Sequence, residues 1–142
     1  MAGYSGTPLA RKLGIKQGAA VALLGAPDAF ETLLAPLPPA VTVQRDPAVP
    51  MNPGTYDVVV GFTTRRDTLA HWIRDVRPAL KPAAGLWIAW PKRAARIATE
   101  VTEDTVRELA LPTGLVDNKV CAIDETWSGL RLVVRRELRR PA

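Results

Sequence analysis

The sequence has only one cysteine and one histidine among its 142 residues, and this scarcity limits the chemistry it can support. Cys121 has no second cysteine with which to form an intramolecular disulfide, which suits a reducing compartment such as the cytoplasm. One histidine and one cysteine cannot build a His/Cys metal centre, so we expect no metal site. His71 falls within an expected helix and off its apolar stripe, as a solvated residue does. Cys121 lies within an expected strand and is interpreted as a buried, inert thiol.

Long apolar runs and phosphate-binding loops are also lacking. No apolar stretch approaches the roughly 20 residues that a membrane-spanning helix needs. Residues 1–7 do not show the basic-then-apolar layout of a secretion signal. There is no Gly-x-x-x-x-Gly-Lys-Ser/Thr loop. We therefore expect a soluble, cytoplasmic protein with no membrane partner.

Positive charge is in excess, but it is unevenly distributed. The formal net charge is +5. From residue 131 onward there are five arginines and one glutamate, so that end carries four of the excess charges. The arginines are Arg131, Arg135, Arg136, Arg139 and Arg140. A nucleic-acid binder normally spreads its cations over a continuous face, so any nucleic-acid binding is expected to be non-specific. The alternative is a solvated sheet edge that prevents aggregation.

Apolar runs typical of buried strands alternate with amphipathic segments typical of helices. We expect strands at 20–24, 41–43, 56–62, 86–90, 119–123 and 130–136, and helices that begin near residues 8, 28, 64 and 102. Alternating strands and helices favour a parallel sheet with right-handed crossovers. The sequence therefore predicts one α/β domain over 1–142, with a mostly parallel sheet of about six strands and a C-terminal antiparallel hairpin. A helical arm (1–18) precedes it and a basic segment (131–142) ends it. The expected spatial order of the strands, by first residue, is 41, 20, 56, 85, 130, 118.

Local start and stop signals support these boundaries. Thr7, Thr64 and Thr102 are expected to cap three of the helices. Pro82 is expected to lie between the third helix and the strand at 86–90. Gly129 is expected at the re-entry of the hairpin loop 124–129.

The turn after the first strand is the expected binding region. Residues 20–24 stop at Gly25 and Pro27, and a helix follows. In an open α/β sheet a ligand is held beyond the carboxyl ends of the strands where the winding direction reverses. We expect that reversal between the strands at 20–24 and 56–62.

This layout is similar, over about residues 19–137, to a reduced class I methyltransferase fold, which is a Rossmann-like sheet with a terminal antiparallel hairpin. Parts of the chain also resemble an uncharacterised bacterial family, the domain of unknown function numbered 3052. The matching segments are YSGTPL at 4–9, KLGI at 12–15, LLGAP at 23–27, WIAWPK at 87–92 and LPTGLVDNKVCAIDETWSGL at 111–130. The resemblance implies a bacterial, cytoplasmic protein and brings no known activity or catalytic residue.

The sequence departs from the methyltransferase pattern at the first turn. Such enzymes carry a run of glycines there and an acidic residue after the second strand, which holds the ribose hydroxyls of the cofactor. Here Gly25 stands alone, and Pro27 lacks an amide donor. Asp46 either is the ribose acid or is a turn residue before Pro47.

Three expected strand ends bring polar and aromatic side chains to the same edge of the sheet. The candidate ligand-binding residues are Gly25, Pro27, Arg65, Arg66, Trp90, Lys92, Asp124, Glu125 and Trp127. They can hold an anionic or planar ligand through arginine contacts and indole stacking. Alternatively, the charged residues form ion pairs with one another and the tryptophans close the top of the core.

The residues favour a non-catalytic module that binds a small ligand or a protein partner. One alternative is a methyltransferase-like enzyme that uses S-adenosylmethionine or another nucleotide at Gly25. A second is a weak nucleic-acid accessory protein that uses the arginine-rich end. The sequence identifies no catalytic residue and leaves the ligand, the partner and the oligomeric state open.

Overall fold

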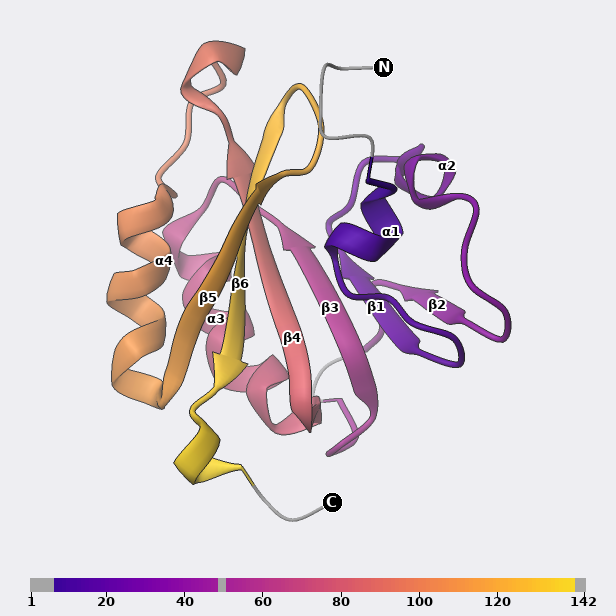
Figure 1. The fold of residues 1–142 in the computed structure, drawn as a ribbon. Helices are drawn as coiled ribbons and strands as arrows, with labels where there is room; N and C mark the ends of the chain where they lie inside the picture. The colour runs from indigo at the N-terminus through magenta and orange to yellow at the C-terminus, as the bar shows by residue number, and fades with distance from the viewer. Residues whose placement is uncertain (1–6, 49–50, 140–142) are drawn as a thin grey trace.

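The computed structural model describes residues 7–48 and 51–139, and within them six strands form a single sheet. The strands are β1 (Ala20–Leu24), β2 (Thr42–Arg45), β3 (Tyr56–Phe62), β4 (Leu80–Pro91), β5 (Leu115–Ala122) and β6 (Trp127–Val134). Their order is β2-β1-β3-β4-β6-β5. Strands β2, β1, β3 and β4 are parallel, and β6 runs antiparallel to both β4 and β5 (Figure 1). The predicted Rossmann-like architecture and strand order are confirmed.

The central strands are apolar along their whole length because helices and loops cover both faces of the sheet. In β1 the side chains of Val21, Ala22 and Leu23 have no exposed surface, and Val59 and Val60 of β3 are equally buried. β1 pairs directly with β3, as expected from these two runs.

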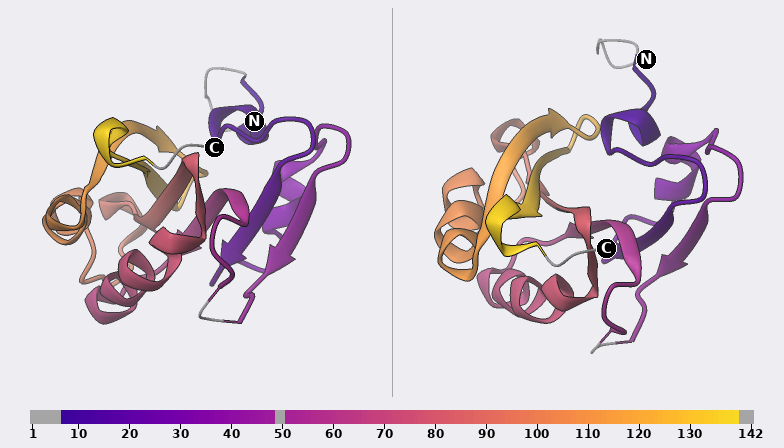
Figure 2. Two further views of the ribbon diagram at one scale, coloured as in Figure 1. Left: turned by 90° about the horizontal axis from the view of Figure 1, so that it is seen from below. Right: turned by 60° about the horizontal axis from the view of Figure 1, so that its bottom comes forward.

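The helices are divided between the two faces of the sheet. They are α1 (Leu9–Lys12), α2 (Phe30–Leu34), α3 (Arg66–Val76) and α4 (Glu103–Ala110), with short 3-10 turns η1 (Arg77–Ala79), η2 (Arg93–Ala95), η3 (Leu111–Thr113) and η4 (Arg136–Leu138). Figure 2 shows α3 and α4 side by side on one face, with α1 on the other. Each face has its own apolar core. Trp87 joins α1 to the sheet, because its indole Nε1 donates a 3.0 Å hydrogen bond to the Leu13 carbonyl.

The helix caps follow the sequence prediction at one of three sites. Thr102 caps α4 and forms a reciprocal capping box with Thr105. Thr64 does not cap α3; instead the carboxylate of Glu100, from the loop before α4, accepts the Arg66 amide at 3.0 Å. Thr7 does not cap α1 either: the flanking residue is Pro8, with no side-chain cap. The start of α3 is therefore capped by Glu100, which is distant in sequence, and not by the nearby Thr64.

Several strand boundaries also differ from the prediction. β4 begins at Leu80, and Pro82 lies inside it, near a register irregularity against β3 where a ladder bond is already interrupted. β5 and β6 both begin earlier than expected, so Gly129 is within β6. β6 also ends at Val134, and the arginines at 135 and 136 lie beyond it.

The basic C-terminal segment is therefore not the sheet edge proposed from the sequence. β6 lies between β4 and β5, and β5 is the edge strand. Residues 1–6 of the expected N-terminal arm and 140–142 of the basic segment lie outside the described residues. None of the helices within 7–48 and 51–139 is long and apolar enough to cross a membrane.

Candidate functional site

The turn after β1 is built around Gly25 and Asp46. Gly25 has a φ of +61°, and an added Cβ would lie 2.8 Å from the Phe62 carbonyl oxygen, so a larger residue is excluded by both conformation and space. The Gly25 amide donates a 2.8 Å hydrogen bond to Oδ1 of Asp46. The Asp46 amide in turn donates to the Leu23 carbonyl at 2.7 Å. An exposed carboxylate thus lies directly beside the end of β1.

Arg45, at the end of β2, holds the rest of this turn. Its guanidinium donates to the carbonyls of Ala26 (2.7 Å) and Pro27 (2.8 Å) and forms a 2.6 Å ion pair with Glu31 of α2. The hydrogen bond from Arg45 is the main cause that lowers the pKa of Glu31 and raises the pKa of Arg45. The turn is consequently fixed from two directions, by Asp46 at its start and by Arg45 along its length.

The polar groups that this turn presents fit one part of an adenosyl cofactor, its ribose. Oδ2 of Asp46 accepts no hydrogen bond from the described residues, so it can accept one from a ribose hydroxyl. The Gly25 amide is already bonded to Asp46, and Pro27 has no amide hydrogen. The turn therefore offers a carboxylate for the ribose but few main-chain donors for the remainder of the cofactor.

The two tryptophans of the sequence-predicted site lie on opposite faces of the sheet. Trp90 belongs to the core beneath α3 and α4 and is 8% exposed. Trp127 is half-buried against the other core. Its ring packs edge-on against Phe62, whose ring also contacts Phe30 at 4.9 Å between centroids. The two indoles do not line one concavity.

The side chains of two charged residues of that set, Arg66 and Asp124, have partners in the fold. Arg66 reaches across to Glu108 of α4 in a 2.7 Å ion pair. Oδ1 of Asp124 accepts the amides of Thr126 (2.8 Å) and Trp127 (2.7 Å) and so shapes the β5–β6 turn.

The remaining residues of the set share the carboxyl edge but do not form a single cluster there. The Lys92 amide joins the β5–β6 turn through a 2.7 Å hydrogen bond to the Thr126 carbonyl. Arg65 and Glu125 are exposed. A ligand role for these residues stays a prediction.

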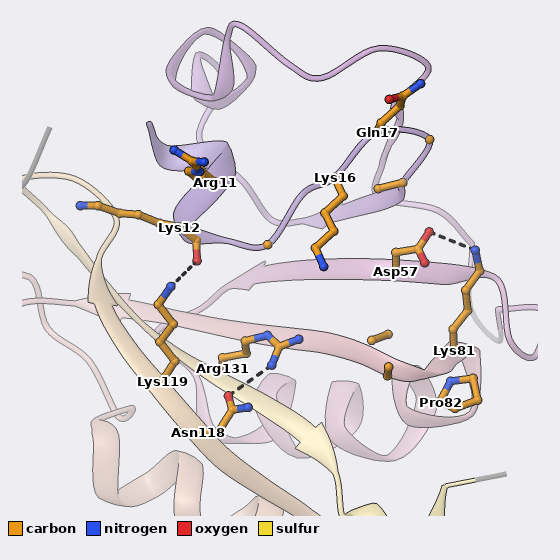
Figure 3. Close-up of a pocket in the computed structure, with 15 residues that line it drawn as sticks. Arg11, Lys12, Lys16, Gln17, Asp57, Lys81, Pro82, Asn118, Lys119 and Arg131 are labelled. Atoms are coloured by element: carbon orange, nitrogen blue, oxygen red, sulfur yellow. Dashed lines mark hydrogen bonds and ion pairs between the residues drawn. The ribbon is translucent and has the colours of Figure 1, made fainter. Parts of the chain in front are cut away.

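A basic cavity, which the sequence does not predict, lies at the other end of the sheet. Its volume is about 770 Å³, and it lies between the loop after α1 and the starts of β3 and β4 (Figure 3). The cations that line it are Arg11, Lys12, Lys16, Lys81, Lys119 and Arg131. They come from four separate stretches of the chain, at 11–16, 81, 119 and 131, so no local pattern in the sequence marks them.

Neither His71 nor Cys121 forms an evident reactive centre. His71 is exposed on α3, and its Nε2 lies 3.8 Å from the Asp75 carboxylate. Burial raises the pKa of the Cys121 thiol, and the charges of Lys12 and Lys119 oppose that effect. In the described part of the chain no three His, Cys, Asp or Glu side chains are grouped so that they could hold a metal ion.

Comparison with solved structures finds the same fold in several methyltransferases. A S-adenosylmethionine-dependent methyltransferase from Aquifex aeolicus superposes with a TM-score of 0.64 at 14% identity, covering 87% of each chain. Fibrillarin from Aeropyrum pernix, solved with natively bound S-adenosylmethionine, gives 0.62 at 14% identity over 93% of this chain and 71% of its own.

A third similar structure comes from Haloferax volcanii, where a proposed methyltransferase is in complex with a methyltransferase activator. It gives a TM-score of 0.62 at 12% identity over 89% of this chain and 86% of its own. At these identities the likeness shows the class I methyltransferase-like, Rossmann-like fold alone. No family model and no curated protein matches the chain, so the resemblance to the bacterial family numbered 3052 is not confirmed.

Proposed function

We propose that the protein is a reduced methyltransferase-type domain that binds S-adenosylmethionine at the turn after β1. The observation that carries the proposal is the position of Asp46. It follows β2, the strand beside β1, and its carboxylate is fixed 2.8 Å from the Gly25 amide. In dinucleotide-binding Rossmann folds an acidic residue after the second strand binds the ribose hydroxyls.

Each residue of the turn has a defined task in this proposal. Oδ2 of Asp46 accepts a hydrogen bond from a ribose hydroxyl, while Oδ1 keeps its bond to the Gly25 amide. Arg45 holds the carbonyls of Ala26 and Pro27, so the turn keeps its shape when the ligand arrives. Bound S-adenosylmethionine supplies an electrophilic methyl group. The likeness to methyltransferases, one of them with this compound bound, supports the choice of ligand.

Binding is expected to be weak, with a dissociation constant above the low micromolar range. A run of glycines normally exposes several amides to the cofactor, and this turn has one glycine whose amide is already bonded. The cofactor is therefore held mainly through its ribose.

The clamp of Arg45 on the turn favours a second candidate, a non-catalytic module that binds a small molecule or a protein. A turn closed by its own side chains needs no cofactor for its order. The structurally similar Haloferax protein that binds an activator supports a protein partner in this case. We also propose, from the sequence segments quoted above, that the chain belongs to the bacterial family numbered 3052 and acts in the cytoplasm.

A ligand series separates the two candidates. Thermal unfolding is followed with S-adenosylmethionine, S-adenosylhomocysteine and adenosine at several concentrations, up to millimolar. The methyltransferase-type proposal predicts a concentration-dependent rise of Tm with all three compounds, because all carry the ribose. A ligand at one hundred times its dissociation constant adds about 2.7 kcal/mol to the free energy of unfolding. An unchanged Tm with all three compounds would contradict the methyltransferase-type proposal and favour the non-catalytic module.

A further inference from the structure

The basic cavity beneath α1 lies at the opposite end of β1 from Asp46. It is lined by the starts of β3 and β4, by β5 and β6, and by the loop after α1. Six cationic side chains line it against a single carboxylate, that of Asp57. The cavity therefore carries a positive charge excess that equals the +5 of the whole chain.

Arg131 is a partly buried cation of the cavity. Its guanidinium lies across Gly85 of β4, where an added Cβ would come within 2.5 Å of Nε. Its hydrogen bond within the described residues goes to a neutral acceptor, Oδ1 of Asn118, at 3.3 Å, and no carboxylate in that part of the chain pairs with it. Burial lowers the pKa of Arg131, yet a guanidinium stays protonated at neutral pH. A partly buried charge without a counter-ion is unfavourable, and an anion in the cavity would relieve it.

Lys16 and Lys119 add to this charge. The ammonium of Lys16 points into the cavity in Figure 3, and it makes no hydrogen bond or ion pair with any described residue. Lys119 donates to the Lys12 carbonyl at 3.0 Å, and this neutral acceptor leaves its charge uncompensated. Lys81 differs, because Asp57 pairs with it at 3.0 Å. Three cations thus face the cavity without a matching carboxylate.

We propose that this cavity binds a small organic anion with at least two phosphate groups, a nucleoside diphosphate or a sugar bisphosphate. Two or more phosphates can bridge Lys16, Arg131 and Lys119 at once, and arginine and lysine both bind phosphate strongly. The volume of about 770 Å³ suits a ligand of this size. None of the lining residues is aromatic, and base stacking on aromatic rings is what single-stranded nucleic-acid sites use. The proposal is independent of the function proposed for Asp46.

Calorimetry on the full chain with defined probes tests the proposal. The probes are inorganic phosphate, inorganic pyrophosphate, ADP and fructose 1,6-bisphosphate. Pyrophosphate is expected to bind at least tenfold more tightly than phosphate, because it reaches more than one cation. ADP against the bisphosphate distinguishes the two sources of the phosphates.

Two variants locate the site, and a third is the matched control. Lys16→Gln and Arg131→Gln are each expected to weaken pyrophosphate binding about tenfold, the effect of one lost charged hydrogen bond. Arg93→Gln removes one charge from an exposed residue of η2, at the other end of β4, and should leave the affinity unchanged. The Lys16 side chain is exposed and makes no hydrogen bond or ion pair with the described residues, so Lys16→Gln is expected to fold even if Arg131→Gln disturbs packing.

Three results would overturn the proposal. The first is the absence of binding by any of the four probes at millimolar concentration. The second is an equal loss of affinity in Arg93→Gln and Lys16→Gln, which reports net charge rather than a site. The third is a single-stranded oligonucleotide that binds more tightly than ADP and loses its affinity in Lys16→Gln, because the cavity would then be part of a nucleic-acid surface.

Discussion

The indole of Trp127 packs edge-on against the ring of Phe62, with centroids 5.2 Å apart and an angle of 87° between the ring planes. This contact joins the start of β6 to the end of β3. It covers the apolar core at the carboxyl edge of the sheet, beside the turn that holds Gly25.

Replacement of Trp127 by alanine should therefore reduce stability. Loss of a buried tryptophan costs about 3–5 kcal/mol, and because Trp127 is only half-buried we expect about 2–3 kcal/mol in denaturant unfolding. Trp127→Phe keeps the edge contact and should cost less than half as much. An alanine variant as stable as the parent would show that the ring contact does not support the edge.

Gly61 is expected to tolerate no larger residue while Trp72 is present. A Cβ at Gly61 would lie 2.6 Å from Cζ3 of Trp72, well inside van der Waals contact with the indole of α3. Overpacking of this kind costs about 1–3 kcal/mol, so Gly61→Ala should lower the unfolding midpoint in urea. In a Trp72→Leu background the same substitution should cost much less, since neighbouring sites are coupled. An equal loss of stability from Gly61→Ala in both backgrounds would show that overlap with the Trp72 indole is not the cause.

The ion pair between Glu31 and Arg45 should make stability depend on pH in the acid range. The hydrogen bond from Arg45 lowers the pKa of Glu31 in the folded protein. The ion pair therefore contributes to the free energy of unfolding above the pKa of Glu31 in the unfolded chain, about 4.3. This contribution is lost as the pH falls through the lower pKa of Glu31 in the folded protein. Glu31→Gln should be slightly less stable than the parent at pH 7 and equal to it near pH 2. Glu125→Gln, at an exposed carboxylate, is the control, and a Glu31→Gln deficit that persists near pH 2 would contradict the assignment.

Cys121 should react slowly with thiol reagents in the folded protein. It is half-buried, and burial raises the pKa of its thiol, so little thiolate is present at neutral pH. Reaction with a disulfide reagent at pH 7.5 should be at least tenfold slower than in denaturant, where the thiol is solvated. A native rate equal to the denatured rate would indicate an activated cysteine.

The sheet could be predicted from the sequence because its signals are local and repeated. The runs at 20–24 and 56–62 are too apolar to lie anywhere but in the middle of a covered sheet. Connection rules then fix the order of the remaining strands. The cap at Thr102 could be predicted because its signal is local: Glu103 and Asp104 follow it in the first turn, and its partner Thr105 is only three residues away. The predicted cap at Thr64 was wrong because the carboxylate that accepts a main-chain amide at the start of α3 belongs to Glu100, which is distant in sequence.

The site was only partly predictable for the same reason. Asp46 could be found as a candidate because it follows a short strand, and its hydrogen bond from the Gly25 amide places its carboxylate beside the end of β1. Its positive φ of 49° also fits a turn residue, so the ribose role stays a prediction. Arg131 was assigned to a basic C-terminal segment, whereas β6 turns it toward the α1 face and across Gly85. That contact depends on the register in which β4 pairs with β6, and the residues next to Arg131 in the sequence do not reveal that register.

The central claim, a ribose-binding carboxylate at the turn after β1, is tested most directly by calorimetry of S-adenosylmethionine with the parent protein, Asp46→Asn and Asp28→Asn. Asparagine keeps the acceptor for the Gly25 amide and tolerates the positive φ of residue 46, so this variant removes only the charged oxygen. We expect weak binding by the parent, about tenfold weaker binding by Asp46→Asn, and no change in Asp28→Asn, an exposed acid of the same turn. Equal affinity in the parent and Asp46→Asn, or no binding by the parent at millimolar ligand, would contradict the claim.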